Sequence, residues 1–184
     1  LSLHVALPIL LSRADTGCTY YFQRYLAKNK SDLLIKDAWQ KMAFAWYIAG
    51  NMSKAGYCRN QIDKYGTARL DADKQAEKFA RQDAWPMRQL LHARLLIDGG
   101  YYSEALPILN AFDRATLTNP ADKAEYFFRM GRILEETGEG NKALGYYRQS
   151  ITTGRARHEQ FAARAALQMG HIYEQTGNLK LAAD

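Results

Sequence analysis

The sequence predicts an all-α fold, a right-handed α-solenoid built from repeated helix-turn-helix hairpins. One observation is a recurring G-x-x-x-x-A pattern, which is found at 50–55, 100–105, 138–143 and 177–182. Another is a small residue that precedes each pattern at a constant distance, namely Ala43, Ala93, Gly131 and Gly170. The last two steps between these small residues are 38 and 39 residues, whereas the first step carries an insertion. A nearly fixed period that holds two helices is typical of a helical solenoid.

The clearest hairpin runs from Ala124 to Ala143. Its first helix places four residues on one face at i, i+3, i+4 and i+7, namely Phe127, Met130, Gly131 and Leu134. Gly138 is expected to end this helix, because glycine takes the left-handed conformation without steric cost. Ala143 then opens the apolar stripe of the second helix. We expect Gly131 to let the backbone of the second helix come close.

The turns between the helices resemble those of the tetratricopeptide repeat family. They read G-N-M-S-K-A, G-Y-Y-S-E-A, G-E-G-N-K-A and G-N-L-K-L-A, against a family turn of glycine, Asn or Asp, an aromatic residue and a later alanine. The resemblance covers residues 36–184, and the whole chain is also similar to repeat proteins of Bacteroidota bacteria. The chain departs from the family in its period, which exceeds ~34 residues, and in Arg59, where an aromatic residue is usual. The resemblance implies a binding scaffold.

Helical patterns and polar breaks alternate in the first part of the chain. Residues 19–29 read as one helix. Ser31 or Asp32 is predicted to cap the next helix, which ends at Gly50, and its partner is expected over residues 53–64.

The segment 67–84 is predicted to be an insertion that holds a short polar helix. Asp71 and Asp73 are expected to cap that helix. Its apolar stripe is thin, because it consists of two alanines and Phe79. We interpret the segment as a surface spacer, with a partner-docking arm as the alternative.

The second half of the chain carries stronger local signals. Trp85-Pro86 is predicted to start a helix, with the proline in its first turn. Asn119 and Pro120 form an N-cap followed by a proline at the first helical position. A loop is expected over residues 152–157, and the last unit begins at Phe161.

The first residues are predicted not to be native. Ala6-Leu7-Pro8-Ile9 is the translation of a common sequencing-adaptor string, and no starting methionine precedes it. A signal peptide is the alternative, but no basic segment precedes the apolar run. We therefore expect residues 1–10 to be an adaptor scar. Residues 11–184 are expected to form one solenoid, with an inserted helix at about 67–84, truncated at both ends.

Residue types that support catalysis do not occur at the required spacings. His158-Glu159 begins the zinc-protease pattern H-E-x-x-H, but Ala162 stands where the second histidine must be. The two cysteines, Cys18 and Cys58, have no partner at metal or redox spacing, and we interpret them as small buried residues. We expect no enzymatic activity, no cofactor and no metal site.

The charge pattern is that of a solvated surface. The net charge is +6, but basic residues alternate with acidic ones, as in K-Q-A-E-K-F-A-R. Nucleic-acid binding needs a clustered basic stripe, so this pattern disfavours it. No apolar run is long enough to span a membrane.

The family resemblance implies that the first helix of each hairpin lines a concave groove that binds a peptide. On that basis the candidate groove residues are Phe44, Tyr47, Leu90, Arg94, Phe128, Arg132, Glu135, Leu167, His171 and Glu174. Arg94, Arg132 and His171 occupy equivalent positions and would form a ladder of donors. Alternatively, Arg132 and His171 are neutralised by the glutamates three residues further on.

We therefore interpret the chain as a scaffold that binds a peptide or a partner protein. Two alternatives stay open at this point. One is a sensor or regulatory segment of a larger signalling protein, and the other is an RNA-binding helical array.

Overall fold

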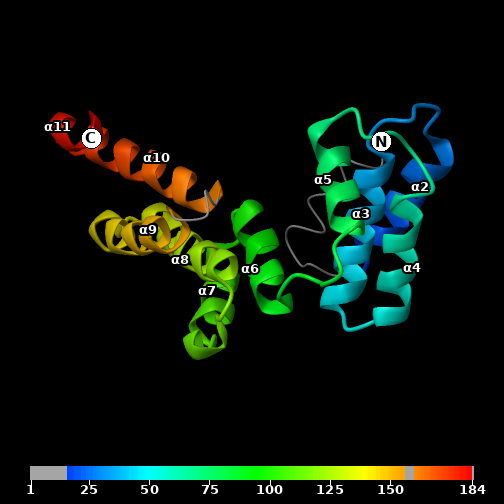
Figure 1. Cartoon of the computed structure of the whole chain (residues 1–184), viewed down its shortest axis with the longest axis horizontal. Coiled ribbons are helices and arrows are strands. Elements are labelled where there is room, and N and C mark those ends of the chain that lie inside the picture. The colour runs from blue at the N-terminus through cyan, green and yellow to red at the C-terminus, as the bar shows by residue number, and fades with distance from the viewer. Residues whose placement is uncertain (1–15, 156–159, 184) are drawn as a thin grey trace. The chain divides into compact units, whose positions relative to one another are not determined.

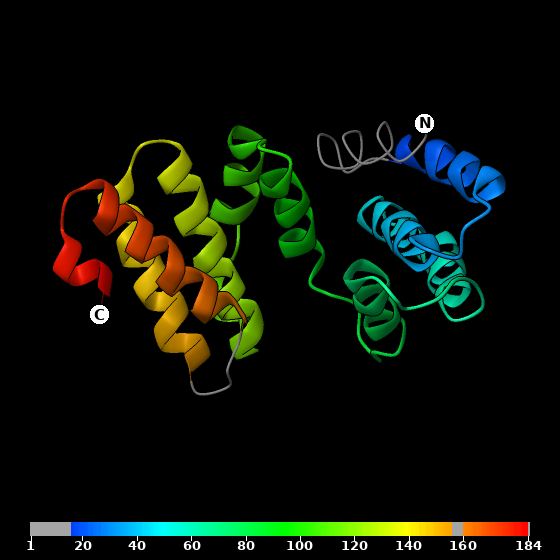
Figure 2. The same ribbon diagram turned by 90° about the horizontal axis from the view of Figure 1, so that it is seen from above.

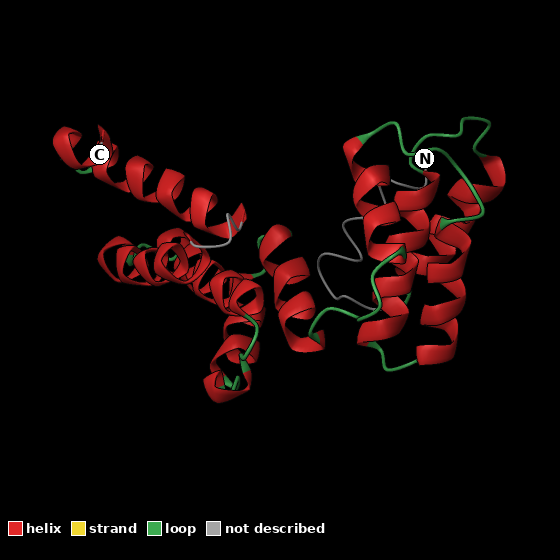
Figure 3. Ribbon diagram, viewed as in Figure 1, coloured by secondary structure: helices red, strands yellow, loops and turns green. Residues whose placement is uncertain are grey.

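The structure, a computed structural model, describes residues 16–155 and 160–183. Within these ranges every regular element is a helix, and Figure 3 shows no strand. The predicted all-α class, built of helix-turn-helix repeats, is confirmed. The chain divides into two compact units, unit 1 (Leu1–Tyr101) and unit 2 (Tyr102–Asp184). The expected adaptor scar lies outside the described residues, and a single solenoid through residues 11–184 stays a prediction.

Unit 1 is organised around one central helix. Its helices are α2 (Cys18–Lys28), α3 (Ile35–Ile48), α4 (Met52–Ile62), α5 (Asp71–Ala80) and α6 (Arg88–Asp98) (Figure 1). The other four helices all pack against α3, whose buried stripe includes Met42 and Ala43. Cys18 and Cys58 lie buried in the same core, as the sequence predicts. Burial raises the pKa of the Cys58 thiol to about 11, so this cysteine is an inert core residue.

Unit 2 is a stack of helices around the hairpin that the sequence predicts most clearly. It contains α7 (Tyr102–Asn110), a 3₁₀ turn η1 (Arg114–Thr116), α8 (Pro120–Glu136), α9 (Gly140–Gly154), α10 (Gln160–Gln175) and α11 (Leu179–Ala183). Helix α9 packs against both α8 and α10, and α8 also contacts α10 (Figure 2). The faces of α8 and α10 that point away from α9 therefore belong to one surface.

The predicted glycine turns are present. The backbone φ angles of Gly50, Gly100, Gly138 and Gly177 are 82°, 82°, 84° and 75°, all in the left-handed region. At Gly138 the amide donates to the Glu135 carbonyl at 3.1 Å, and the Glu139 amide donates to the Leu134 carbonyl at 2.7 Å. The same pair of bonds closes the other three turns. This is the Schellman arrangement, in which a glycine satisfies the last carbonyls of a helix.

The predicted boundaries of α6 and α9 are wrong, whereas the predicted cap of α8 is confirmed. Helix α6 begins at Arg88, so Trp85 and Pro86 precede it and do not form its first turn. Helix α9 continues through Gly154, so residues 152–154 are helical and not part of a loop. Asn119 does cap α8, because its side chain accepts the Ala121 amide at 3.0 Å.

The cap of α3 comes from an unexpected place. Its N-cap residue is Leu34, with a left-handed φ of 59° and no side-chain cap of its own, so neither Ser31 nor Asp32 caps this helix. Instead, the carboxylate of Asp73 accepts the Leu34 amide at 2.8 Å and the Asp37 amide at 3.1 Å. Asp73 thus caps α3 and not its own helix α5.

The interpretation of residues 67–84 as a surface spacer is therefore wrong. Asp73 is 0% exposed, and Ala76 and Phe79 on the same helix are buried in the core of unit 1. Lys36, buried at the start of α3, donates to the Ile62 carbonyl at 2.7 Å and pairs with Glu77 of α5 at 3.3 Å. Helix α5 is a structural part of unit 1, held by polar bonds that a hydrophobic pattern does not reveal.

Candidate functional site

In unit 2, Arg132 connects the two helices that carry most of the predicted groove residues. Its Nη1 donates to Glu135 of the same helix at 3.2 Å and to Gln168 of α10 at 3.3 Å. Its Nη2 donates to Glu136 at 2.6 Å. The intrahelical ion pair expected from the spacing is present. The contact with Gln168 adds a link between α8 and α10 that the sequence does not indicate.

Electrostatics keep this arginine charged. Partial burial acts to lower the pKa of Arg132, but electrostatic interactions with Tyr147 and with the carboxylates of Glu135 and Glu136 outweigh it and raise the pKa. The guanidinium is therefore a permanent cation whose position is fixed by carboxylates on its own helix.

Tyr147 of α9 contacts α8 beside Arg132, and it binds the Glu135 carboxylate that also pairs with Arg132. Its ring lies against Gly131, where an added Cβ would be 2.5 Å from ring carbon Cε1. Its hydroxyl donates to Glu135. Burial, followed by this hydrogen bond, raises the pKa of Tyr147 strongly. The prediction that Gly131 admits a second backbone is wrong, because the glycine makes room for a tyrosine ring.

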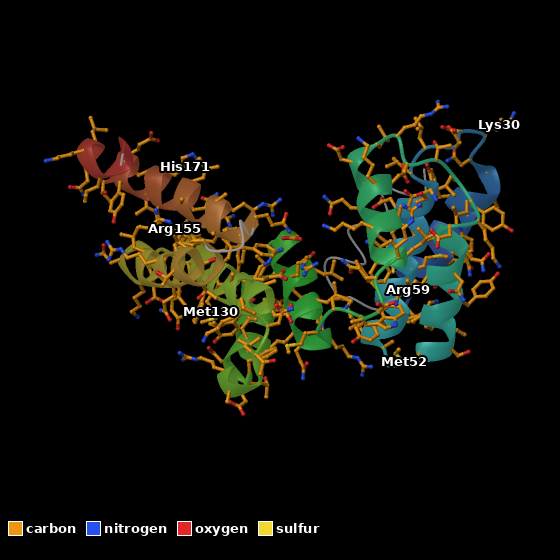
Figure 4. All side chains as sticks on the ribbon, in the orientation of Figure 1. Lys30, Met52, Arg59, Met130, Arg155 and His171 are labelled. Atoms are coloured by element: carbon orange, nitrogen blue, oxygen red, sulfur yellow. The ribbon has the colours of Figure 1, made fainter. Side chains whose placement is uncertain are left out.

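The neighbouring face of α10 is open to solvent. Leu167 is 59% exposed, and His171 and Glu174 are also exposed. Figure 4 labels His171 on this helix. The three residues are spaced at i, i+4 and i+7, so they share one side of the helix. We call Arg132, Leu167, Gln168, His171 and Glu174 the α8–α10 surface.

Other predicted groove residues have different environments. Leu90 is 1% exposed and Phe128 is 5% exposed, so both contribute to the cores of their units. Phe128 packs between the rings of Tyr147 and Phe161, with centroids 6.0 and 5.6 Å away. Arg94 is half-buried in unit 1. The ladder that would align it with Arg132 and His171 of unit 2 stays a prediction.

The remaining two groove residues, Phe44 and Tyr47, belong to an aromatic cluster in unit 1. Tyr47 stacks on Trp85, with ring centroids 4.6 Å apart and planes inclined by 21°. Its hydroxyl donates to the Pro86 carbonyl at 2.9 Å. Phe79 lies edge-on to both Phe44 and Trp85. The cluster joins α3, α5 and the segment that leads to α6.

Two arginines cover this cluster, and sequence reasoning did not find either of them. The Arg59 guanidinium carbon lies 5.3 Å from the centroid of Trp85 and 5.0 Å from that of Phe79. The corresponding atom of Arg88 lies 4.9 Å from the centroid of Tyr47. Arg59 is labelled in Figure 4. No local spacing relates Arg59, Trp85 and Arg88, because they lie on α4, on the segment before α6 and on α6.

The described part of the chain offers little that is typical of an enzyme site. A cleft of about 470 Å³ lies between the α8–α9 turn and the end of α10, lined among others by Glu135, Gly140 and Ile172. No group of three or more His, Cys, Asp or Glu side chains in residues 16–155 and 160–183 could hold a metal ion. None of the described helices has the length and hydrophobicity needed to cross a membrane.

Fold and surface together define a helical-hairpin repeat protein with open faces on its helices. The sequence matches no family model, and no curated protein matches it. One solved structure, "Crystal Structure of Rap Protein Complexed with Competence and Sporulation Factor", is similar, with a TM-score of 0.49 and 18% identity. The match covers 91% of this chain and 45% of that one, so the chain spans less than half of its neighbour. At this score the similarity carries no argument about function.

Proposed function

We propose that this protein is a non-enzymatic scaffold that binds a peptide or a partner protein, and that the α8–α10 surface is a binding site. The observation that supports this most is the arrangement of α8 and α10. Arg132 fixes the two helices side by side, and Leu167, His171 and Glu174 are left open to solvent beside it.

The chemistry of this surface suits a peptide better than a small molecule. It combines one large exposed apolar side chain, Leu167, with a cation, an amide and a carboxylate. Protein interfaces typically surround apolar anchors with polar groups that fix orientation.

The RNA-binding alternative has less support. In the described residues many cations already pair with carboxylates, among them Lys36, Lys41, Arg81, Arg132 and Lys142. Such cations cannot form the continuous positive stripe that a phosphate backbone requires. A role as a sensor segment of a signalling protein would use the same scaffold, with the bound partner as its signal.

The proposal is tested with a pair of matched substitutions. The protein is used to capture a partner from the source cells, and its affinity for the identified partner is then measured by isothermal titration calorimetry. Leu167→Asp should weaken binding about tenfold or more, because it places a charge in an apolar contact. Leu179→Asp changes another exposed leucine, on α11, and should leave affinity unchanged. Equal affinities for both variants and the wild type would place the site elsewhere.

A further inference from the structure

We propose that Arg59 and Arg88 form a second binding surface, in unit 1, that holds the carboxylates of an acidic peptide. This inference rests on the proposed scaffold function and adds the chemical class of the partner. It starts from the stack of Tyr47 on Trp85 and from the guanidinium groups that cover its rings.

The two arginines are positioned but not neutralised. Within the described residues neither Arg59 nor Arg88 forms an ion pair with a carboxylate. Arg59 donates one hydrogen bond, from Nη2 to the Ala80 carbonyl at 3.3 Å. Arg88 makes one weak contact, from Nη2 to the sulfur of Met52 at 3.9 Å. This sets them apart from Arg81, which pairs with Glu77 in the same unit.

Stacking on aromatic rings prepares a guanidinium to bind an anion. Each guanidinium has five N–H donors in one plane, and here at most one of them is used. An aromatic face holds that plane in place, so little side-chain freedom is lost when a carboxylate binds. Arg88 is exposed and Arg59 is half-buried, so both can reach a ligand at the surface.

A peptide fits this surface better than a nucleic acid. Proteins bind single-stranded nucleic acid by stacking bases on free aromatic faces. In this cluster the faces of Tyr47 and Trp85 are already covered by each other and by guanidinium groups. Two isolated cations match a pair of carboxylates, and the exposed Met52 beside Arg88 offers an apolar contact to a neighbouring side chain.

The experiment uses a fluorescein-labelled short peptide of alternating glutamate and leucine. Its matched control replaces every glutamate with glutamine, and a short single-stranded RNA serves as the third probe. Fluorescence anisotropy should show that the wild-type protein binds the glutamate peptide and prefers it to the glutamine peptide.

Substitutions then locate the site. Arg88→Gln should reduce the affinity for the glutamate peptide about tenfold, because a hydrogen bond to a charged group is worth roughly that factor. The affinity of Arg88→Lys should lie between those of the wild type and Arg88→Gln, since lysine keeps the charge but not the planar donors. Arg81→Gln, an exposed control in the same unit, should bind like the wild type. Arg59→Gln should reduce the affinity for the glutamate peptide as Arg88→Gln does, and circular dichroism checks that this variant is folded. If it is not folded, Arg88→Gln alone decides the test, because Arg88 is exposed.

Three results would overturn the inference. One is equal affinity of the wild type for the glutamate and glutamine peptides. Another is unchanged glutamate-peptide binding in Arg88→Gln. The last is RNA binding that is tighter than binding of the glutamate peptide and that Arg88→Gln weakens. The Leu167→Asp variant distinguishes failure of this inference from failure of the proposed function. It changes only unit 2, so it should bind the glutamate peptide at Arg88 like the wild type.

Discussion

The two units fix the start of their central helices in opposite ways. In unit 2, α8 is capped by Asn119, the residue directly before it, and Pro120 occupies its first position. In unit 1, α3 has no local side-chain cap and is capped by Asp73, which lies on α5. The start of α8 is therefore determined by adjacent residues, whereas the start of α3 depends on tertiary structure.

The two units also differ in the contacts that join their helices. Unit 2 joins α8 to α9 by fitting the Tyr147 ring against Gly131. Unit 1 joins α5 to α3 through the buried charges of Asp73, which accepts two amides at the start of α3, and Lys36, which pairs with Glu77. Buried charges are costly unless every one is bonded, so unit 1 should be the more sensitive to loss of a single polar group.

The largest expected effect is that of Asp73→Ala. It would leave the buried Asp37 amide and the half-buried Leu34 amide without their acceptor, and should lower the free energy of unfolding of unit 1 by about 3 kcal/mol. All three tryptophans, Trp39, Trp46 and Trp85, lie in unit 1, so tryptophan fluorescence in a urea titration reports this unit selectively.

The control for this prediction lies two residues away on the same helix. Asp71 is exposed and pairs with Lys74 at the surface. Asp71→Ala should cost less than about 1 kcal/mol. A similar loss in both variants would mean that α5 contributes nothing more than an ordinary surface helix.

A smaller effect is expected from Gly131→Ala in unit 2. The added methyl group would meet the ring of Tyr147, which is fully buried and held by its bond to Glu135. Overpacking should outweigh the better helix propensity of alanine and destabilise unit 2 by about 1–2 kcal/mol. Thermal unfolding followed by circular dichroism measures this change.

The matched glycine for that test is Gly145 on α9, where an added Cβ would meet no atom within 4 Å. Gly145→Ala should stabilise the helix by about 0.5–1 kcal/mol. If both substitutions shifted the melting temperature in the same direction, the close fit of Tyr147 against Gly131 would be disproved.

The smallest effect concerns pH and unit 1. Burial lowers the pKa of His92 below its ordinary value. The unfolded chain then binds a proton more readily than the folded chain, so stability from neutral His92 is present above about pH 6.5 and lost as the pH falls through the lower folded value. Unit 1 should be less stable at about pH 5.5 than at about pH 7.5. His92→Gln should reduce that difference, and an unchanged pH profile would contradict the assignment.

Sequence reasoning succeeded where the determinants are local. The glycine turns, the Asn119 cap and the apolar stripe of α8 all follow from residues within a few positions of one another. It failed at Asp73 and at the Arg59–Trp85 contact, because both join residues more than twenty positions apart. Polar bonds of this kind leave no periodic pattern.

In the candidate site, too, only the contacts between residues close in the sequence could be predicted. The spacing of Arg132 and Glu135 predicts their ion pair, and the structure contains it. The link from Arg132 to Gln168 depends on how α8 and α10 pack, so it could not be read from spacing. Burial of Leu90 and Phe128 likewise depends on neighbours far along the chain.

Hydrogen–deuterium exchange of the full chain with its captured partner tests the central claim most directly. Bound partner should protect the exposed parts of α8 and α10 around Arg132 and Leu167, while the outer face of α9 around Gln149 exchanges as in the free protein. An acidic partner should also protect the segment around Arg88. Protection confined to α9, with none on α8 or α10, would contradict the account.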